Sequence, residues 1–381
     1  MLYLDHAATS PVRPEVLEAM GPYLGGVFGN PSSHHPVGEA AARALDDARA
    51  RVAAVLGMRT GDVVFTSGGT EANNLAVKGI VLAALGRGRN RVVTTRIEHE
   101  SILESADFLR RFHGVKVDFA PVDATGTLTP DALAGTLRPD TALVSFGHAN
   151  NEIGTVQDVA SLTAIARERG IPVHVDAVQS AGWLDLAHLG ADAVSIAGHK
   201  LGAPKGTGVL AVRGRVPLEP LVHGGGQERG RRSGTENVAG AVAVAVALEI
   251  AERERTEVAE RVGATTQRFI AGVLGAVPSA ALTGHPVHRL PGTASFTFAG
   301  TSGEAVLLEL ERRGVVSSSG SACAAGSDEP SHVLLALGIR PEVAQTSVRF
   351  TFGRASLPEG TAEQLAAAVA DAVRAVGSPA H

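Results

Sequence analysis

The segment PVHVDAVQSAGWLDLAHLGADAVSIAGHK, residues 172–200, contains the pattern that decides the fold. It holds two short apolar runs, Pro172 to Val175 and Ala193 to Ile196. The first leads directly into Asp176, and the second leads through Ala197 and Gly198 to His199 and Lys200. If the two runs are neighbouring parallel strands, their carboxyl ends lie at one edge of the sheet, where open parallel sheets bind ligands. Asp176 and Lys200 would then share one site.

Similar apolar runs recur between residues 60 and 212, with helical stretches between them. The remaining runs are Asp62 to Phe65, Arg91 to Thr95, Val115 to Phe119, Ala142 to Phe146 and Val209 to Val212. Strands that alternate with helices need crossover connections, which give a mainly parallel sheet covered on both faces. The sequence therefore predicts an α/β fold with a mainly parallel seven-stranded sheet flanked by helices.

Two further helices follow from apolar residues at helical spacing. One precedes the sheet at Gly38 to Leu56, and a long one follows it at Glu236 to Arg261, where it could bridge to a second unit. The length of 381 residues also favours two domains. We expect a large domain over residues 15–255 and a small α+β domain made of residues 1–14 and 256–381.

The small domain is expected to contain an antiparallel sheet. Thr293 to Phe298 and Ser347 to Phe352 alternate strictly, with valine and phenylalanine on one face of the second run and Arg349 and Thr351 on the other. Such alternation is typical of a sheet with one face in solvent. A helix with Leu365 and Val369 on its apolar face closes the domain.

Composition excludes several classes of function. The 34 basic residues are outnumbered by 39 acidic ones and form no separate run, so we expect no nucleic-acid partner. The longest apolar stretch, Val238 to Leu248, is shorter than the about 20 residues of a membrane span. No secretory signal is evident, and we expect a cytoplasmic protein. A single cysteine permits neither an intrachain disulfide nor a Cys-rich metal site, so no metal is expected.

The residues after the predicted strands suit pyridoxal phosphate. This cofactor needs an amine that condenses with its aldehyde and a carboxylate that keeps its ring nitrogen protonated. Only Lys78, Lys116, Lys200 and Lys205 are available as amines. Lys200 as a solvated loop lysine and Asp176 as a helix cap are the ordinary alternatives, but their placement at one rim favours the cofactor site.

Two more strand ends offer binding groups. Thr66 to Asn73 is a Gly-rich turn that opens a helix, where backbone amides and the helix dipole suit a phosphate; the alternative is a tight turn capped by Thr70. His99 follows the run that ends at Thr95 and is a candidate catalytic residue, although a lone histidine is more often a surface or capping residue.

The C-terminal part adds a thiol and a guanidinium group. Cys323 lies in a Ser, Gly and Ala stretch that is too small and polar for a core strand, which favours an accessible loop and a nucleophilic thiolate over a buried cysteine. Arg349 has the planar fork that binds a carboxylate in two hydrogen bonds, although exposed strand arginines are commoner.

Taken together, the motifs resemble cysteine desulfurases of the NifS/IscS type, which belong to the class V aminotransferase group of fold-type I pyridoxal phosphate enzymes. The matching segments extend nearly from end to end and are Tyr3 to Thr9, Gly29 to Ser33, Thr66 to Asn74, Ile97 to His99, Asn150 to Gly154, His174 to Ser180, Gly198 to Lys200, Arg232 to Thr235, Ser319 to Cys323 and Val348 to Phe350.

The resemblance implies a role for each matching site residue. Lys200, Cys323 and His99 would be catalytic, and Asp176 would bind the ring nitrogen. The other cofactor-binding residues would be Gly69, Thr70, Asn151, Gln179, His199 and, from the other subunit of a homodimer, Thr235. Asn30, Asn151 and Arg349 would bind the substrate. Ala197 stands where many relatives have a serine, so the phosphate anchor would depend on the helix N-terminus, His199 and Thr235.

The resemblance also implies a reaction and partners. Sulfur would be removed from L-cysteine to give L-alanine and a persulfide on Cys323. The persulfide would pass to an acceptor protein such as an iron-sulfur scaffold, where Cys323 is a candidate ligand of a transferred cluster, or serve thio-cofactor or tRNA biosynthesis. The loop around Cys323 resembles the NifS/IscS group more than the SufS group.

Other functions fit parts of the sequence. A selenocysteine lyase or another class V aminotransferase needs Lys200 and Asp176 but no loop thiol. A non-catalytic sulfur carrier on the same fold is disfavoured, because every expected catalytic position is filled. A nucleotide-dependent enzyme is also disfavoured, because the chain lacks the phosphate-binding motifs G-x-x-x-x-G-K-[ST] and G-x-G-x-x-G after a strand.

Overall fold

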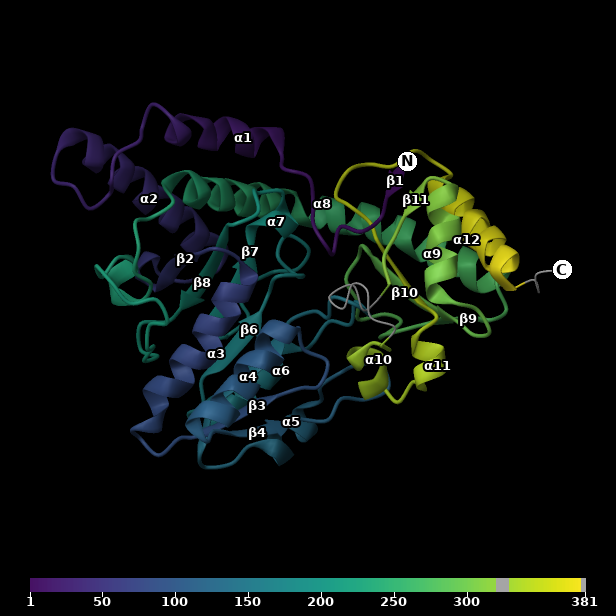
Figure 1. Ribbon diagram of the computed structural model, residues 1–381, viewed down its shortest axis with the longest axis horizontal. Coiled ribbons are helices and arrows are strands. Elements are labelled where there is room, and N and C mark those ends of the chain that lie inside the picture. Colours follow the sequence, from purple (N-terminus) through teal and green to yellow (C-terminus); the bar gives the residue numbers. More distant parts are fainter. Residues whose placement is uncertain (320–328, 378–381) are drawn as a thin grey trace.

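The computed structural model describes residues 1–319 and 329–377. Figure 1 shows a larger body around one sheet and a smaller body that contains both ends of the chain. The helices are α1 Pro14–Met20, α2 Pro36–Val55, α3 Gly69–Leu85, α4 Glu100–His113, α5 Pro130–Thr136, α6 Val159–Glu168, α7 Gly198–Leu201, α8 Val238–Ala276, α9 Gly303–Arg312, α10 His332–Ala336, α11 Pro341–Ala344 and α12 Thr361–Gly377. The strands are β1 Leu2–Tyr3, β2 Val63–Thr66, β3 Arg91–Thr94, β4 Lys116–Phe119, β5 Thr141–Gly147, β6 Val173–Asp176, β7 Ala193–Ala197, β8 Gly208–Val212, β9 Ala280–Leu282, β10 Thr293–Phe298, β11 Val315–Val316 and β12 Ser347–Thr351.

The large sheet has the order β2-β8-β7-β6-β5-β3-β4 among the described residues. Strands β7, β6, β5, β3 and β4 are parallel to one another, and β8 runs antiparallel to both of its neighbours, β7 and β2. Every predicted strand is present. The predicted fold class, a mainly parallel seven-stranded sheet flanked by helices, is confirmed.

Alternation along each strand explains why helices cover both faces of this sheet. Val93 and Val144 pack with α2, α6 and α8, whereas their neighbours Val92 and Leu143 pack with α3 and α4 on the other face. Successive side chains of a strand point to opposite faces, so a continuous apolar run can serve two helix layers. The sheet is therefore buried on both sides.

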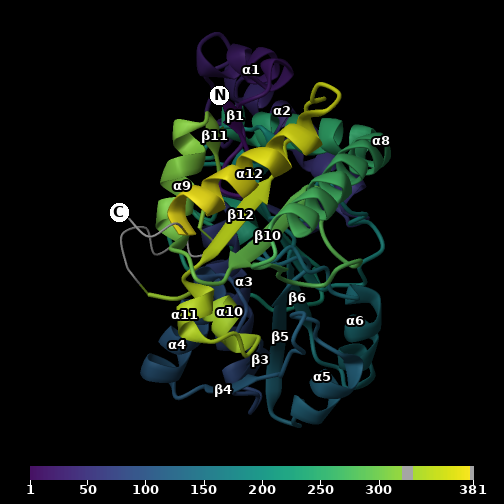
Figure 2. The same ribbon diagram turned by 90° about the vertical axis from the view of Figure 1, so that its right-hand side faces the viewer.

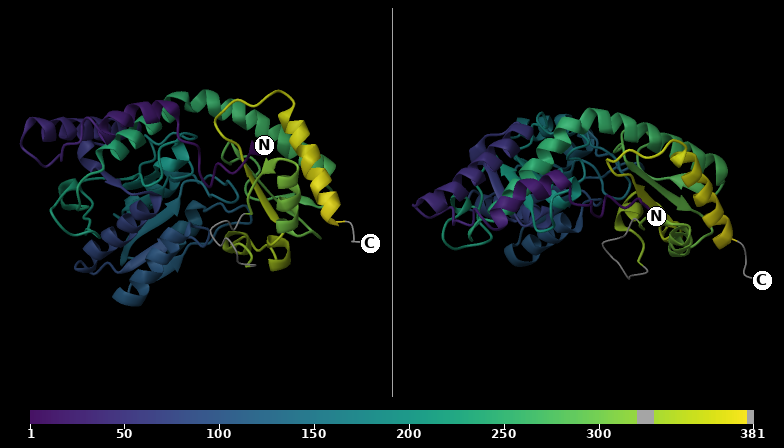
Figure 3. Two further views of the ribbon diagram at one scale, coloured as in Figure 1. Left: turned by 45° about the horizontal axis from the view of Figure 1, so that its top comes forward. Right: turned by 90° about the horizontal axis from the view of Figure 1, so that it is seen from above.

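Helix α8 connects the two bodies. It runs for 39 residues, so it begins near the predicted start but ends at Ala276 instead of Arg261. Its first part, with Val244 and Leu248, packs in the core of the large sheet, and Phe269 and Val273 pack in the core of the smaller body. Figure 3 shows α8 extending along the top of both bodies.

The smaller body contains a three-stranded antiparallel sheet of order β12-β10-β9, and β1 from the N-terminus pairs in parallel with β11. Phe269 of α8 packs edge to face against three phenylalanines of or next to this sheet, Phe296, Phe350 and Phe352, and Phe296 packs edge to face against Phe350. Figure 2 shows α8 and α12 beside β10 and β12. This separate core supports the proposed division into residues 15–255 and residues 1–14 with 256–381.

The prediction of a half-solvated small sheet is wrong. All five residues of β12 are buried, and the Arg349 side chain is only 3% exposed. The reason is that the polar face of β12 lies against the N-terminal segment and the loop after β5, where Arg349 contacts Asp5 and the carbonyl oxygen of Asn151. Within residues 1–319 and 329–377, no helix has the length and hydropathy that crossing a membrane requires.

Candidate active site

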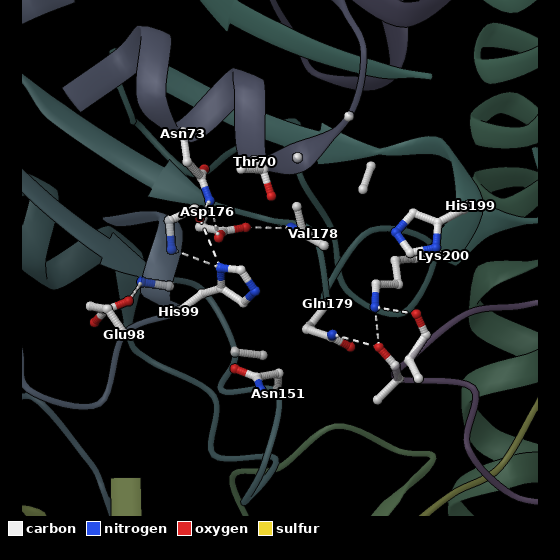
Figure 4. Close-up of a pocket in the computed structure, with 18 of the residues that line it drawn as sticks. Thr70, Asn73, Glu98, His99, Asn151, Asp176, Val178, Gln179, His199 and Lys200 are labelled. Atoms are coloured by element: carbon white, nitrogen blue, oxygen red, sulfur yellow. Dashed lines mark hydrogen bonds between the residues drawn. The ribbon is translucent and has the colours of Figure 1, made fainter. Parts of the chain in front are cut away.

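A cavity of about 610 Å³ lies at the carboxyl edge of the large sheet, between the N-terminal segment and the starts of α3 and α4. Figure 4 shows side chains from these separate segments pointing toward one another. Nine residues predicted for the site line it together: Gly69, Thr70, His99, Asn151, Asp176, Gln179, His199, Lys200 and Arg349. Sequence positions far apart are thus brought to one place.

Strand register explains why Asp176 and Lys200 meet there. β6 and β7 are adjacent and parallel, with Asp176 opposite Ser195, and β7 continues into α7, which contains Lys200. The Lys200 ammonium group donates hydrogen bonds to the carbonyl oxygens of Ala7 and Ala8, the second at 2.7 Å. The N-terminal segment therefore holds this lysine inside the cavity.

Helix α3 presents its N-terminus to the cavity. Its N-cap is Gly68, which has no side chain, and Thr70 lies inside the first turn and is not the cap. The first backbone N–H groups of a helix have no acceptor within it, so they suit an anion. Close packing also shapes this turn, since a Cβ on Gly69 would lie 2.7 Å from Val178.

Two lysines and a histidine line the same cavity as this helix end. Lys200 and Lys205 line the cavity, and His199 lies beside them with Nδ1 3.1 Å from the Thr9 hydroxyl. The pKa of His199 is lowered to about 4, mainly by burial and also by the charges of Lys200 and Lys205. His199 is thus neutral near neutral pH and offers a hydrogen bond, while the lysines supply charge for an anion.

Asp176 accepts two hydrogen bonds that fix its carboxylate. Val178 N donates to Oδ1 at 2.9 Å, and Asn73 Nδ2 donates to Oδ2 at 2.6 Å. Asn73 Nδ2 also lies 2.9 Å from Ser101 Oγ, and Ser101 Oγ lies 2.8 Å from His99 Nδ1. His99 is itself the N-cap of α4, so the predicted alternative of a capping histidine also holds.

Glu98 is buried next to His99 and joins two loops. Its carboxylate accepts from the Thr95 hydroxyl and from Gly147 N, both at 2.6 Å. Burial raises the pKa of Glu98 to about 7; the two donors oppose this rise, and nearby Asp176 adds to it. The Glu98 carboxyl group thus attaches the loop that contains His99 to Gly147 at the end of β5.

Arg349 and Gln179 close the side nearest the small domain. Arg349 donates to the Asn151 carbonyl oxygen at 2.9 Å and to Asp5 Oδ1 at 2.7 Å. Gln179 Nε2 donates to the Ala7 carbonyl oxygen at 3.1 Å. Substrate groups entering here would meet a guanidinium whose orientation is already set.

Two predicted site residues in the described part of the chain do not line this cavity. Asn30 lies in the loop before α2, where its Oδ1 accepts from Ser32 N. Thr235 lines a separate cavity of about 270 Å³, which shares Ser67 and Gly206 with the first. Cys323 lies outside the described residues.

Sequence reasoning missed Asn73, Ser101 and Asp5 as contributors to the site. Asn73 lies one helical turn after Thr70, and Ser101 lies two residues after the cap His99, so both spacings place a polar side chain near a helix start. No local signal could pair Asp5 with Arg349, because the two are 344 positions apart. Within the described part of the chain, no group of three or more His, Cys, Asp or Glu side chains could hold a metal ion.

Comparisons with known proteins agree on one family. The model for "Aminotransferase class-V" matches residues 2–363. Cysteine desulfurase IscS of Dictyoglomus turgidum is 44% identical over 354 residues, covering 92% of this chain and 89% of that protein. A solved structure named NifS-like protein has a TM-score of 0.90 at 34% identity, covering 98% of this chain and all of the other.

A second solved structure, SspA in complex with cysteine, has a TM-score of 0.82 at 34% identity and covers 94% of this chain and 100% of that one. The resemblance to NifS/IscS-type proteins inferred from the motifs is thereby confirmed. Since the family model spans nearly the whole chain, this protein belongs to the aminotransferase class-V family.

Proposed function

We propose that the protein is a cysteine desulfurase that converts L-cysteine to L-alanine and leaves the sulfur as a persulfide on Cys323. The observation that supports this most directly is the meeting of Asp176 and Lys200 in one cavity whose lining also includes His99 and Arg349. The relatives named cysteine desulfurase support the same reaction. The family depends on pyridoxal phosphate, and the donors of this cavity fit that group.

Different groups of the cavity suit different parts of the cofactor. The N-terminus of α3 with Gly69 and Thr70, together with His199, suits the phosphate. Asp176 would pair with the ring nitrogen, Lys200 would bind at the aldehyde, and Asn151 and Gln179 would contact the ring's phenolic oxygen and the substrate side. When bound, pyridoxal phosphate supplies an electron sink for charge that develops at the substrate Cα.

Side chains of the protein would bind the substrate and carry out the proton and sulfur transfers. Arg349, held by Asp5, would bind the substrate carboxylate as a fork, and Asn30 would also contact the substrate. The Lys200 amine would take the proton from Cα and return protons to the product. The Cys323 thiolate would form a bond to the substrate sulfur as the carbon–sulfur bond breaks, and the electron pair of that bond would remain with the alanine skeleton.

We further propose that the active protein is a homodimer. Thr235 lines a neighbouring cavity that shares Ser67 and Gly206 with the active-site cavity. The family resemblance implies that Thr235 of the other subunit contacts the phosphate. A sulfur-acceptor protein such as an iron-sulfur scaffold would take the persulfide, and we expect the reaction to occur in the cytoplasm. Selenocysteine lyase activity and other class V chemistry are the alternatives.

Intact mass measurement after incubation with L-cysteine tests reaction and nucleophile together. The purified, cofactor-loaded protein should gain one sulfur atom, lose it on reduction and release alanine. The Cys323→Ser variant should show neither the mass gain nor sulfide release, and Lys200→Ala should form no borohydride-stable bond to the cofactor. Undiminished sulfide release by Cys323→Ser would disprove the persulfide route and favour the lyase alternative.

A further inference from the structure

We propose that Asn73 and Ser101 are positioning residues that hold His99 as a neutral imidazole with its proton on Nε2, and that they connect it to Asp176. This inference deepens the proposed function, because the roles of His99 and Asp176 rest on it. The four side chains form one continuous series of hydrogen bonds along the wall of the active-site cavity.

The backbone N–H group of Ser101 determines which ring nitrogen of His99 carries no proton. Ser101 N lies 3.1 Å from His99 Nδ1, and a backbone N–H group can only donate. His99 Nδ1 must therefore present a lone pair to it. A proton on Nδ1 would bring two N–H donors face to face, as would happen in the other neutral tautomer and in the imidazolium ion.

The Ser101 hydroxyl is consistent with this assignment. Asn73 Nδ2 donates to Ser101 Oγ at 2.9 Å, and with Nδ1 unprotonated the hydroxyl proton can point to His99 Nδ1 at 2.8 Å. Nδ1 thus accepts from both the hydroxyl and the backbone of one residue. In a neutral histidine with an unprotonated Nδ1, the proton is on Nε2.

Asp176 determines which way the Asn73 amide points. Nδ2 lies 2.6 Å from Asp176 Oδ2, and the reversed amide would place its oxygen against the carboxylate oxygen. The actual orientation leaves Asn73 Oδ1 buried with no hydrogen-bond partner among the described residues. A buried acceptor without a partner has a free-energy cost, so the contacts to Asp176 and Ser101 outweigh it.

Burial stabilises the hydrogen bonds of Asn73 and Ser101. Asn73 is 1% exposed and Ser101 is 7% exposed, so water has little access to compete for their donors. Figure 4 shows Asn73 and His99 near Asp176; Asn73 contacts Asp176 directly, and His99 is linked to it only through Ser101 and Asn73. His99 would therefore meet the cofactor and substrate through an N–H group at Nε2, as a hydrogen-bond donor and not as a base, in the resting enzyme.

Ring nitrogen NMR tests the assignment directly. The full chain would be labelled with ¹⁵N in its histidine rings, and the His99 signals identified by their loss in His99→Gln. We expect an unprotonated Nδ1 and a protonated Nε2 at neutral pH, both without and with pyridoxal phosphate. A protonated Nδ1 in either form would overturn the proposal, and this readout does not depend on whether the protein desulfurates cysteine.

Matched variants test the positioning role. Ser101→Ala removes the hydroxyl but keeps the backbone N–H, so the NMR signal of His99 Nδ1 should shift while Nδ1 stays unprotonated, and kcat for cysteine should fall about tenfold with little change in KM. Ser101→Thr restores the hydroxyl and should recover both. Ser105→Ala is the control, because Ser105 is buried in the same helix but donates only to the Ser101 carbonyl oxygen.

Equal effects of Ser101→Ala and Ser105→Ala on kcat and on the His99 signals would contradict the positioning role. They would mean that any disturbance of helix α4 has the same effect as loss of the Ser101 hydroxyl. If no variant and no wild-type protein releases sulfide, the proposed function fails while the NMR result still decides the tautomer. Asn73→Leu keeps a similar volume without donors and should shift the absorption of the bound cofactor, because Asp176 loses one hydrogen bond.

Discussion

Glu98 is a single residue in which burial and hydrogen bonding act against each other. Its carboxylate accepts two short hydrogen bonds, which favour the charged form, but it is fully enclosed and lies near the charge of Asp176. Burial is the larger effect and raises its pKa from 4.5 to about 7. Between these pH values the folded chain binds a proton that the unfolded chain has released.

The stability of the protein should therefore fall as pH rises from about 4.5 to about 7, to the extent that Glu98 contributes. Glu98→Gln cannot titrate, so its free energy of unfolding should increase relative to wild type across this window, by at most roughly 3 kcal/mol. Denaturant unfolding at several pH values measures the difference. A difference that does not vary with pH would show that Glu98 titrates normally.

Glu71→Gln is the matched control with the opposite sign. Burial opposes ionisation of Glu71, but hydrogen bonds from Arg232 and Ser67 outweigh it and lower its pKa. Its contribution to stability is thus present above the ordinary glutamate pKa and lost as pH falls. Glu71→Gln should therefore lower the free energy of unfolding more at neutral pH than in acid.

At this scale, the sequence predicted the residues at strand ends and not their partners. Asp176, Lys200 and His99 could be found because each follows an apolar run and has a side chain suited to chemistry. Asn73, which links Asp176 to Ser101, lies on a different element 103 positions away from Asp176. Only the packing of α3 against the sheet edge brings them together.

At the scale of elements, the start of α3 depends on tight packing. A Cβ on Gly69 would lie 2.7 Å from Val178 Cγ2 and 3.3 Å from Ala197 Cβ, so one of these neighbours would have to move. Because the first turn is the proposed phosphate site, such a shift would displace its amides. Ala197 also places a small side chain at this contact.

Gly69→Ala should therefore bind pyridoxal phosphate at least about tenfold more weakly than the wild-type chain, because the loss of one charge-assisted hydrogen bond has that effect. Titration of the cofactor-free protein followed by absorbance measures the affinity. Gly61→Ala is the control, since a Cβ there meets nothing within 4 Å. Unchanged affinity in Gly69→Ala would remove this turn from the phosphate site.

Helix α10 links the small domain to two loops of the active site. Its N-cap Ser331 accepts from Leu334 N and donates to the buried carboxyl group of Glu152, and His332 Nε2 lies 3.0 Å from the Glu98 carbonyl oxygen. Burial raises the pKa of Glu152, and the Ser331 hydroxyl partly opposes that rise. One serine thus satisfies a helix end and a buried acid together.

Ser331→Ala should lower the free energy of unfolding by about 2 kcal/mol, since it removes a cap and leaves a buried carboxyl group with one partner fewer. Ser302→Ala is the comparison, because Ser302 caps α9 at the surface through Ala305 N alone and should cost about 0.5–1 kcal/mol. Denaturant titration of both variants measures the costs. Equal costs would mean that the Glu152 contact adds no stability.

The apolar pattern of the sequence predicted individual strands and helices but not what packs against them. Alternation correctly predicted the strands β10 and β12, but it cannot say what covers their polar face. That face is buried by the N-terminal segment and the loop after β5, both distant in sequence. The end of α8 was underestimated for a similar reason, because its second half is stabilised by the phenylalanine cluster of the small domain.

At the scale of the whole molecule, the proposed active site depends on both ends of the chain. Asp5 comes from the N-terminal segment, Arg349 from β12 and Asn151 from the loop after β5, and the three are joined by two hydrogen bonds. Helix α8 holds the two bodies at a fixed separation by packing into both cores. The position of Arg349 is therefore set by the assembly of the complete fold.

Asp5→Asn should destabilise the protein by roughly 3 kcal/mol, because it removes the charge that balances a guanidinium group buried to 97%. Glu249→Gln is the matched control: its ion pair with Arg51 has nearly the same length but is more than 40% exposed on both sides, so the cost should stay below about 1 kcal/mol. The product L-alanine adds an independent readout. Its carboxylate would replace the lost negative charge at Arg349, so saturating alanine should raise the melting temperature of cofactor-loaded Asp5→Asn more than that of the wild type. An equal rise in both proteins would mean that Arg349 does not receive the carboxylate, even if the stability loss is observed.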